Sequence, residues 1–268
     1  MLKSDKMPRH ANGADKLKKL SDFSELCSYH RQQFMRAVSC PDLTQSRIIG
    51  DLLKITEDTY IGHVAGLGNI STLQDLQSAL PVSSYEALKP MITKIIDGAP
   101  DILFRGRPQS FLKTSGITGK PKLIPQTAHW YENYRGPSRY AQWGMYANFN
   151  PDMLAAPGRV LDLTWERLSP DEFIGGLPCH AITQRPESLG GNDWHPPWYD
   201  SPWFDFRQGN LSWAERLYTK LRYFAGTPLD TIVCVNPSTI AASLTILKEN
   251  KEKLIGDICY GTIHGMPA

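Results

Sequence analysis

Apolar residues recur at helical spacing between residues 21 and 58 of the chain. Pro41 interrupts this pattern, and a proline within a helical pattern ends the helix at the preceding residue. The first part of the chain is therefore predicted to form two helices. A further helix is predicted to begin after Ser83 or Ser84, whose hydroxyls can cap its first turn, and to run through Ile96.

Short apolar runs separate the helical segments in the rest of the chain. Strands are predicted at residues 101–104, 111–113, 122–124, 160–163 and 231–235. Helical periodicity returns at residues 128–146, 211–224 and 238–253, and Ser238 is the expected N-cap of the last of these. Because strands alternate with helices in layered α/β proteins, we expect an α/β fold with a layered mixed sheet flanked by helices.

Residues 165–211 have a different character, with many prolines and a cluster of aromatic side chains near the end. Long irregular segments inside compact domains are usually functional or disordered, and the aromatic density argues against disorder. We interpret the segment as an aromatic, proline-rich insertion that can wall an acyl or aryl pocket, with His180, Trp194 and His195 as candidate substrate contacts. The alternative, favoured by the packing preference of tryptophan, is that the rings fix a loop to the core or form a partner interface.

Composition and charge exclude several classes of protein. No apolar run approaches the roughly 18 residues of a membrane span, and a net charge of +2 gives no reason to expect nucleic acid as a partner. Residues 1–20 are rich in lysine, and we expect them to be a flexible basic tail without a secretory signal. The cysteines form no C-x-x-C pair and the histidines lack metal-site spacing, so we expect no metal centre and a cytoplasmic location.

The strongest functional signal lies between two predicted strands, at residues 114–122. The run is Thr114, Ser115, Gly116, Ile117, Thr118, Gly119, Lys120, Pro121 and Lys122. Glycine lets backbone N–H groups approach an oxyanion, while hydroxyl and ammonium groups add donors and positive charge. These residue types predict a loop that binds a chain of phosphates. A glycine-rich turn that binds nothing is the alternative.

The spacing in this loop distinguishes it from two common phosphate-binding motifs. A Walker loop has its second glycine five positions after the first, and here Pro121 stands five positions after Gly116. No dinucleotide fingerprint G-x-G-x-x-G opens here either. The run resembles the first core motif of the acyl-adenylate-forming ligases, which ends in glycine, any residue, proline and lysine. It departs from that motif only at Ile117, where a hydroxyl residue is usual, and Ile117 still offers its backbone N–H.

Further segments are similar, in the same order, to one branch of that superfamily, the plant auxin-amino acid synthetases and their bacterial relatives. They are residues 81–90 (PVSSYEALKP), 176–178 (GLP), 218–222 (YTKLR), 235–238 (VNPS) and 254–261 (LIGDICYG). The likeness extends over nearly all of residues 21–261. It implies that residues 21–268 are the N-terminal part of the large domain of an adenylate-forming enzyme.

The resemblance implies an enzyme that condenses a carboxylic acid with ATP to acyl-AMP and pyrophosphate, and then transfers the acyl group to an amine or thiol. Thr114, Ser115 and Thr118 would hold the β- and γ-phosphates together with Mg²⁺. Lys122 would neutralise the departing pyrophosphate, so Lys122 and Thr118 are the catalytic candidates, whereas Lys120 is more simply a solvated side chain. The candidate ATP-binding residues are Thr114, Ser115, Gly116, Ile117, Thr118, Gly119, Lys120 and Lys122.

Members of this branch are much longer, and their adenosine-binding motifs and mobile C-terminal domain do not occur before Ala268. We therefore expect a truncated chain, or one half of a split protein that a second polypeptide completes. A phosphate loop without an adenosine pocket is expected to bind ATP poorly. Two alternatives remain open. One is a non-catalytic remnant or scaffold protein that kept the fold, and the other is an unrelated phosphotransferase, for which a second acidic magnesium motif is missing.

Overall fold

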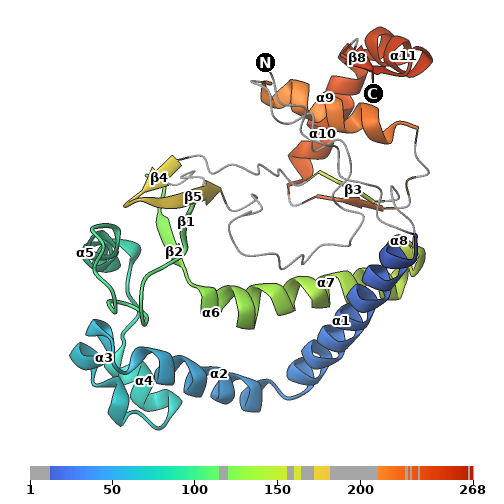
Figure 1. The fold of residues 1–268 in the computed structure, drawn as a ribbon. Coiled ribbons are helices and arrows are strands. Elements are labelled where there is room, and N and C mark those ends of the chain that lie inside the picture. Colours follow the sequence, from blue (N-terminus) through green and yellow to red (C-terminus); the bar gives the residue numbers. More distant parts are fainter. Residues whose placement is uncertain are drawn as a thin grey trace. The chain divides into compact units, whose positions relative to one another are not determined.

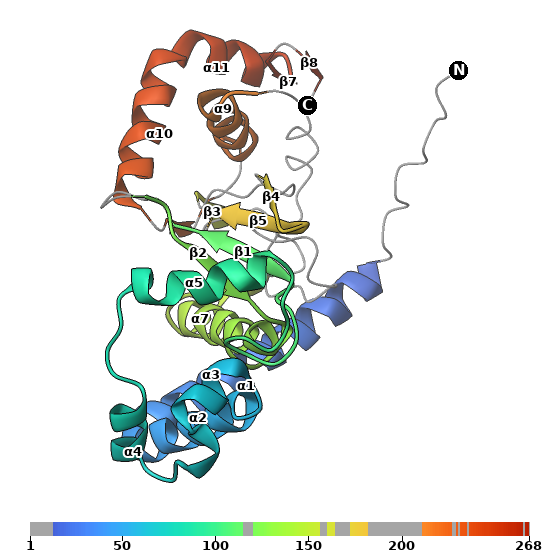
Figure 2. The same cartoon turned by 90° about the vertical axis from the view of Figure 1, so that its left-hand side faces the viewer.

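The computed structural model describes residues 13–114, 120–155, 160–163, 172–181, 211–226, 229, 231–234, 236–264 and 266–267. The chain divides into two compact units. We call residues 32–138 and 165–192 the sheet unit, and residues 1–31, 139–164 and 193–268 the helical unit. Figures 1 and 2 show the elements of each unit from two sides.

Helices make up the N-terminal part of the described chain (Figure 1). They are α1 (Gly13–Ser39), α2 (Pro41–Thr56), α3 (Tyr60–Ala65), η1 (Leu67–Asn69), α4 (Leu73–Ala79) and α5 (Tyr85–Ile96). The predicted break is confirmed, since Pro41 is the first residue of α2, where its missing N–H leaves no helical bond unmade. The predicted tail is too long, because α1 begins at Gly13 and the lysine- and leucine-rich residues 13–20 continue the helix.

The start of α5 is as predicted. The Ser84 hydroxyl accepts a hydrogen bond from the backbone N–H of Ala87 at 3.4 Å, and Tyr85 is the first residue of the helix. The helix ends at Ile96. The N-cap places Tyr85 at a defined position relative to the sheet that follows.

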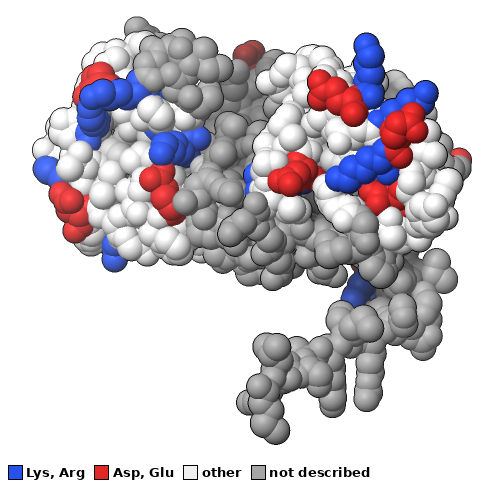
Figure 3. All heavy atoms as spheres, turned by 90° about the horizontal axis from the view of Figure 1, so that it is seen from above, with Lys and Arg blue, Asp and Glu red and all other residues white. Residues whose placement is uncertain are grey.

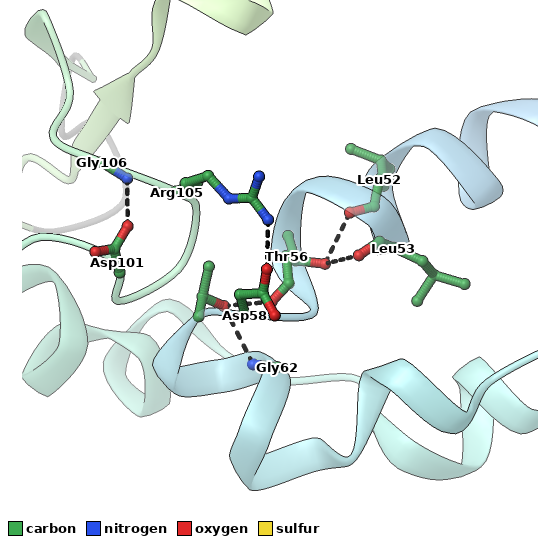
Figure 4. Close-up of polar contacts among 9 residues, drawn as sticks. Leu52, Leu53, Thr56, Asp58, Gly62, Asp101, Arg105 and Gly106 are labelled. Carbon is green, nitrogen blue, oxygen red and sulfur yellow. Dashed lines mark hydrogen bonds and ion pairs between the residues drawn. The ribbon is translucent and has the colours of Figure 1, made fainter.

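Residues 101–104 do not form the predicted strand. Asp101 has a positive φ of 54°, which a β-strand does not accommodate. Its carboxylate accepts from the Gly106 N–H at 2.6 Å (Figure 4), and its carbonyl accepts from the N–H of Tyr60 at 2.7 Å. The apolar run therefore turns sharply and satisfies the first turn of α3 instead of pairing with another strand.

The sheet unit contains a four-stranded sheet in the order β2-β1-β5-β4. Its strands are β1 (Ser110–Lys113), β2 (Leu123–Gln126), β4 (Glu172–Ile174) and β5 (Leu177–Ala181). β1 is antiparallel to β2 and parallel to β5, while β4 is antiparallel to β5. The predicted α/β fold with a mixed sheet is confirmed, as are the strands expected on either side of the loop.

β4 and β5 form a hairpin inside the segment predicted to be irregular, so that prediction is wrong for residues 172–181. The strands are short and Pro178 interrupts the sequence pattern of the second, which concealed it. Gly175 and Gly176 form the turn, with φ of 56° and 76°. A Cβ on Gly175 would lie 2.2 Å from the carbonyl oxygen of Ile96, so only glycine fits between the hairpin and the end of α5.

One face of the sheet packs against α5 (Figure 2). Phe111 of β1 and Cys179 of β5 are partners in register and are fully buried. They share one apolar cluster with Ile95 of α5 and Ile102. Since burial of a side chain such as Phe111 contributes about 1.5–3 kcal/mol, this cluster holds α5 on the sheet.

The helix predicted at residues 128–146 is present as three consecutive helical pieces. These are α6 (Ala128–Trp130), the π-helical turn η2 (Tyr131–Arg135) and α7 (Gly136–Phe149). Tyr131 is buried, and its hydroxyl bonds the side chain of Gln126, the last residue of β2. Gln126 also accepts from the Ser110 hydroxyl of β1 at 3.4 Å. The helix is thereby tied to both strands that flank the loop.

The helical unit contains a parallel strand pair and several helices. Its elements are α8 (Asp152–Ala155), β3 (Val160–Asp162), α9 (Trp213–Phe224), β6 (Thr231–Val233), α10 (Pro237–Glu249), α11 (Lys251–Cys259), β7 (Thr262–Ile263) and β8 (Met266–Pro267). The predicted strands at 160–163 and 231–235 and the helix at 211–224 are confirmed. The predicted helix at 238–253 is two helices, α10 and α11, which meet at Asn250.

The predicted N-cap of α10 is wrong. The capping residue is Asn236, whose side-chain oxygen accepts from the Ser238 N–H at 3.1 Å. Pro237 occupies the first helical position, which it favours, so the cap is the residue before it.

A buried carboxylate joins α9 to α11 and β7. Asp257 accepts from the hydroxyls of Tyr218 at 2.7 Å and Thr262 at 2.6 Å, and from the His264 N–H at 3.1 Å. Burial, together with Asp257, raises the pKa of Tyr218. Arg222 donates to the carbonyl of Asp257 at 2.7 Å. Two segments that carry the family resemblance, residues 218–222 and 254–261, thus meet in one polar network.

α1 and α7 approach each other closely within the helical unit. A Cβ on Gly144 of α7 would lie 2.4 Å from the carbonyl oxygen of Cys27 of α1. Cys27 is buried, and burial raises the pKa of its thiol to about 12. Cys27 is therefore a neutral core residue at physiological pH.

Candidate functional site

The predicted phosphate loop connects β1 to β2, and its two ends are bonded to each other. The Thr114 N–H donates to the Lys122 carbonyl at 3.0 Å, and the Lys122 N–H donates to the Thr114 hydroxyl oxygen at 3.0 Å. The side chains of Lys120 and Lys122 are exposed. The predicted residues Ser115, Gly116, Ile117, Thr118 and Gly119 lie outside the described residues. The structure therefore defines the two ends of the loop, Thr114 and residues 120–122, which we call its neck. The neck carries one hydroxyl group and two ammonium groups.

The strand that leaves the loop is an edge strand, since β2 pairs only with β1 among the described strands. Thr114 and Lys122 form a hydrogen-bonded pair, so by alternation the backbone polar groups of Leu123 and Pro125 point away from β1. At Pro125 this places the missing N–H on the outer edge, where a proline is tolerated. At Leu123 it leaves an N–H and a carbonyl that need a partner.

Tyr85 of α5 supplies that partner. Its hydroxyl accepts from the Leu123 N–H at 2.9 Å and donates to the Leu123 carbonyl at 3.2 Å. The Lys122 Nζ lies 5.7 Å from the centroid of the Tyr85 ring, within the range of a cation–π contact. Tyr85 lies in the segment at residues 81–90 that resembles the family, but the sequence contains no local signal for contacts that span 38 residues.

An ion pair lies at the base of the loop. Lys113, the last residue of β1, places its Nζ 2.5 Å from the Glu172 carboxylate of β4, and both side chains are about two-fifths exposed (42% and 40%). The pair neutralises the lysine that directly precedes Thr114. Lys120 and Lys122 have no carboxylate within ion-pairing distance among the described residues. Their positive charges therefore remain available near the neck.

The predicted substrate contacts are only partly placed. His180 lies on β5, is 3% exposed and pairs in register with Leu112 of β1. Because β1 and β5 are parallel, their carboxyl ends lie on the same side of the sheet. Ligands of α/β sheets bind at the carboxyl ends of the strands. Trp194 and His195 lie outside the described residues, so their roles stay predictions.

The described residues contain no group of three or more His, Cys, Asp or Glu side chains that could hold a metal ion. Within the same residues no helix is long and apolar enough to cross a membrane.

Charges of both signs lie side by side on the face drawn in Figure 3. The described charges on that face therefore form no broad basic surface.

Residues 30–266 match the sequence profile described as the GH3 family N-terminal domain. The chain belongs to the GH3 family. The matched residues include the neck of the loop, the four-stranded sheet and the Asp257 network.

Two curated GH3 relatives match parts of the chain. The "Probable indole-3-acetic acid-amido synthetase GH3.13" of Oryza sativa subsp. japonica is 34% identical over 93 residues, which are 31% of this chain and 20% of the relative. The "Indole-3-acetic acid-amido synthetase GH3.17" of Arabidopsis thaliana is 39% identical over 61 residues, 22% of this chain and 10% of the relative.

Two solved structures share the fold. "GH3.15 acyl acid amido synthetase" superposes with a TM-score of 0.63 at 17% identity, covering 94% of this chain and 42% of that one. "AtGH3.15 acyl acid amido synthetase in complex with 2,4-DB" has a TM-score of 0.55 at 16% identity, with the same coverage. The GH3 fold therefore extends over nearly all of this chain, which spans less than half the length of those structures.

Proposed function

We propose that this chain is the phosphate-binding part of a ligase that activates a carboxylic acid with ATP and transfers it to an amine. The carboxylate oxygen bonds to the α-phosphorus of ATP while the bond from that phosphorus to the pyrophosphate oxygen breaks. The amine nitrogen then bonds to the acyl carbon and loses a proton while the bond from that carbon to AMP breaks, so the products are an amide, AMP, pyrophosphate and a proton. The observation that carries the proposal is the Thr114–Lys122 closure of a glycine loop in a GH3 chain.

The neck of the loop fits a phosphate chain. The hydrogen bond from Lys122 uses a lone pair of the Thr114 oxygen, so the Thr114 hydroxyl proton can be donated to a phosphate oxygen. The closure also holds the end of β1 and the start of β2 together at the base of the loop. The Thr114 hydroxyl is thus preorganised, and a preorganised donor stabilises developing charge without reorganising during the reaction.

We propose that Lys122 stabilises the leaving pyrophosphate. Its ammonium is exposed beside the loop, and the adjacent Lys113 is neutralised by Glu172. Attack of a carboxylate on a triphosphate brings anions together, so the step depends on positioning and on charge stabilisation. We assign this role to Lys122, with Thr118 as a second catalytic candidate in the undescribed part of the loop.

We expect Mg²⁺ to be bound mainly by the phosphates of ATP and less by side chains of this chain. The described residues offer no acidic cage, and Mg²⁺ is commonly bound by substrate phosphates and water with one or two carboxylates. When bound, the ion neutralises phosphate charge. The task of the chain's own residues is to hold the phosphate chain at Thr114 and Lys122.

An amine acceptor is favoured over a thiol because the matched relatives carry amido synthetase names.

We propose residues 21–268 as the N-terminal part of the large adenylation domain, with His180, Trp194 and His195 as candidate acid contacts. The adenosine site and the acceptor site would come from further polypeptide, in the same chain or in a second one. We propose a cytoplasmic location, because none of the five cysteines, all of which lie among the described residues, is in a disulfide bond.

Pyrophosphate and ATP binding by the 268-residue chain tests the proposal, with isothermal titration calorimetry as the measurement. We expect detectable pyrophosphate binding that Lys122→Ala weakens. A chain that binds neither ligand would be a remnant or scaffold that kept the fold. Carboxylate-dependent exchange of pyrophosphate into ATP, measured on the protein completed by the missing part with a broad panel of acids, then tests the reaction itself.

A further inference from the structure

Tyr85 connects α5 to the outer edge of β2. As the first residue of α5 it follows the Ser84 N-cap, and α5 is held on the sheet through Ile95. Its hydroxyl forms hydrogen bonds with both the N–H and the carbonyl of Leu123, as the backbone of a neighbouring strand would. The position of its ring is therefore set by the helix at one end and by the edge of β2 at the other.

The ring of Tyr85 faces the lysine that we place in the reaction. The Lys122 Nζ lies 5.7 Å from the ring centroid. An exposed lysine has many rotamers, and ordering it for one contact opposes that freedom. A cation–π contact at an exposed site shifts a rotamer equilibrium only a few-fold, so it orders the ammonium without preventing it from reaching a phosphate.

We propose that Tyr85 is a positioning residue for pyrophosphate binding, which holds the backbone at Leu123 with its hydroxyl and the ammonium of Lys122 with its ring. The inference rests on the proposed function and assigns a role to a residue outside the loop. The two parts of Tyr85 act separately. Tyr85→Phe removes the two hydrogen bonds and keeps the ring, whereas Tyr85→Leu removes both.

A double-mutant cycle on pyrophosphate binding tests the role of the ring. Calorimetric Kd values would be measured for the wild-type chain, Tyr85→Phe and Tyr85→Leu, each also combined with Lys122→Met. We expect Tyr85→Phe to raise the Kd about two- to tenfold through the lost hydrogen bonds. Tyr85→Leu should raise it about two- to fivefold more through the lost ring contact.

The cycle separates positioning of Lys122 from a purely structural effect. If the ring acts through Lys122, the difference between Tyr85→Phe and Tyr85→Leu disappears in the Lys122→Met background. A difference that persists there, or no difference with Lys122 present, overturns the proposal. Circular dichroism of each variant confirms that the fold is intact at the temperature of the titration.

The sheet unit offers a matched control pair. The Lys94 Nζ lies 4.4 Å from the centroid of the Tyr60 ring, and this pair has no bond to the loop or to β2 among the described contacts. Tyr60→Phe and Tyr60→Leu should bind pyrophosphate as the wild type does. If the wild-type chain binds no pyrophosphate, the proposed function fails and the role of Tyr85 fails with it. If the wild type binds and the Tyr85 variants match it, only the role of Tyr85 fails.

Discussion

Thr114 and Lys122 are joined by two hydrogen bonds of 3.0 Å, one between their backbones and one from the Lys122 N–H to the Thr114 hydroxyl. The first bond continues the β1–β2 ladder by one step. The second replaces a ladder bond by a side-chain bond, so the ladder ends there and the loop begins. The strands and the loop are thus separated by a threonine whose hydroxyl remains a donor.

Thr114→Val should weaken both the fold and ligand binding. The substitution keeps the size of the side chain and removes the oxygen that accepts from Lys122, which leaves that N–H without its protein partner. We expect the free energy of unfolding to fall by about 1 kcal/mol. Urea denaturation measures the change, and pyrophosphate calorimetry should show weaker binding. Thr114→Ser keeps the hydroxyl and should resemble the wild type; equal stability of the valine and serine variants would contradict the closure.

Lys122→Ala should reduce pyrophosphate exchange of the completed enzyme tenfold or more, which corresponds to roughly 1.4 kcal/mol of transition-state stabilisation. The lost group is the cation assigned to the leaving pyrophosphate. Thr118→Ala should have an effect of similar size. Lys120→Ala is the comparison, because Lys120 is a candidate ATP contact that we interpret as solvated, and we expect this variant to lose less activity. A rate loss for Lys120→Ala as large as that for Lys122→Ala would show that the two lysines share the role.

Gly175→Ala should destabilise the chain more than Gly176→Ala. Both glycines have positive φ, so each substitution introduces backbone strain of about 1 kcal/mol or more. At Gly175 the new Cβ would also lie 2.2 Å from the Ile96 carbonyl, whereas at Gly176 nothing lies within 4 Å. The clash should add roughly 1–3 kcal/mol. Thermal or urea unfolding of the two variants measures the difference, and equal losses would mean that the hairpin does not rest against α5 in solution.

Alkaline pH should destabilise the helical unit through Cys27. Burial raises the pKa of this thiol from an ordinary value near 9 to about 12. The folded chain therefore disfavours the thiolate that the unfolded chain forms. The stabilising contribution is complete below about pH 9 and is lost as the pH rises from about 9 to 12, with a limiting slope near 1.4 kcal/mol per pH unit. Tyr218, whose pKa is also raised, adds to the loss at higher pH.

Variants at two cysteines isolate this effect. The slope of the unfolding free energy against pH, measured with urea between about pH 8 and pH 10, should be smaller for Cys27→Ala than for the wild type. Cys40→Ala, which removes an exposed thiol, is the matched control for the loss of one cysteine. The slope and not the absolute stability is decisive, because Cys27→Ala also leaves a cavity. Identical slopes for the wild type and Cys27→Ala would contradict the assignment.

Local chemistry was sufficient to predict several elements. The break at Pro41, the Ser84 cap and the helical pieces at residues 128–146 follow from signals within a few residues of each feature. The strands on either side of the loop are apolar runs bounded by glycine and proline. Family membership could also be predicted, because the loop and the smaller motifs occur in one order along the chain.

Two of the wrong predictions concern segments whose conformation depends on distant partners. Residues 101–104 read as a strand, yet their carbonyls are used by the first turn of α3. β4 and β5 are too short to be recognised in isolation, and they form because β5 pairs with β1 and the turn fits against α5. The cap predicted at Ser238 was wrong because Pro237 occupies the first helical position of α10, which makes Asn236 the capping residue.

The sequence by itself determined the residue types of the loop, the helices with strong periodicity and the membership of the GH3 family, since these depend on neighbours along the chain. Only the tertiary structure decided that Thr114 closes the loop onto Lys122, that Glu172 neutralises Lys113 and that Tyr85 reaches Leu123 across 38 positions. The physical reason is that hydrogen bonds and ion pairs between distant residues depend on how α5, β1, β2 and β4 pack, and no local pattern encodes that packing.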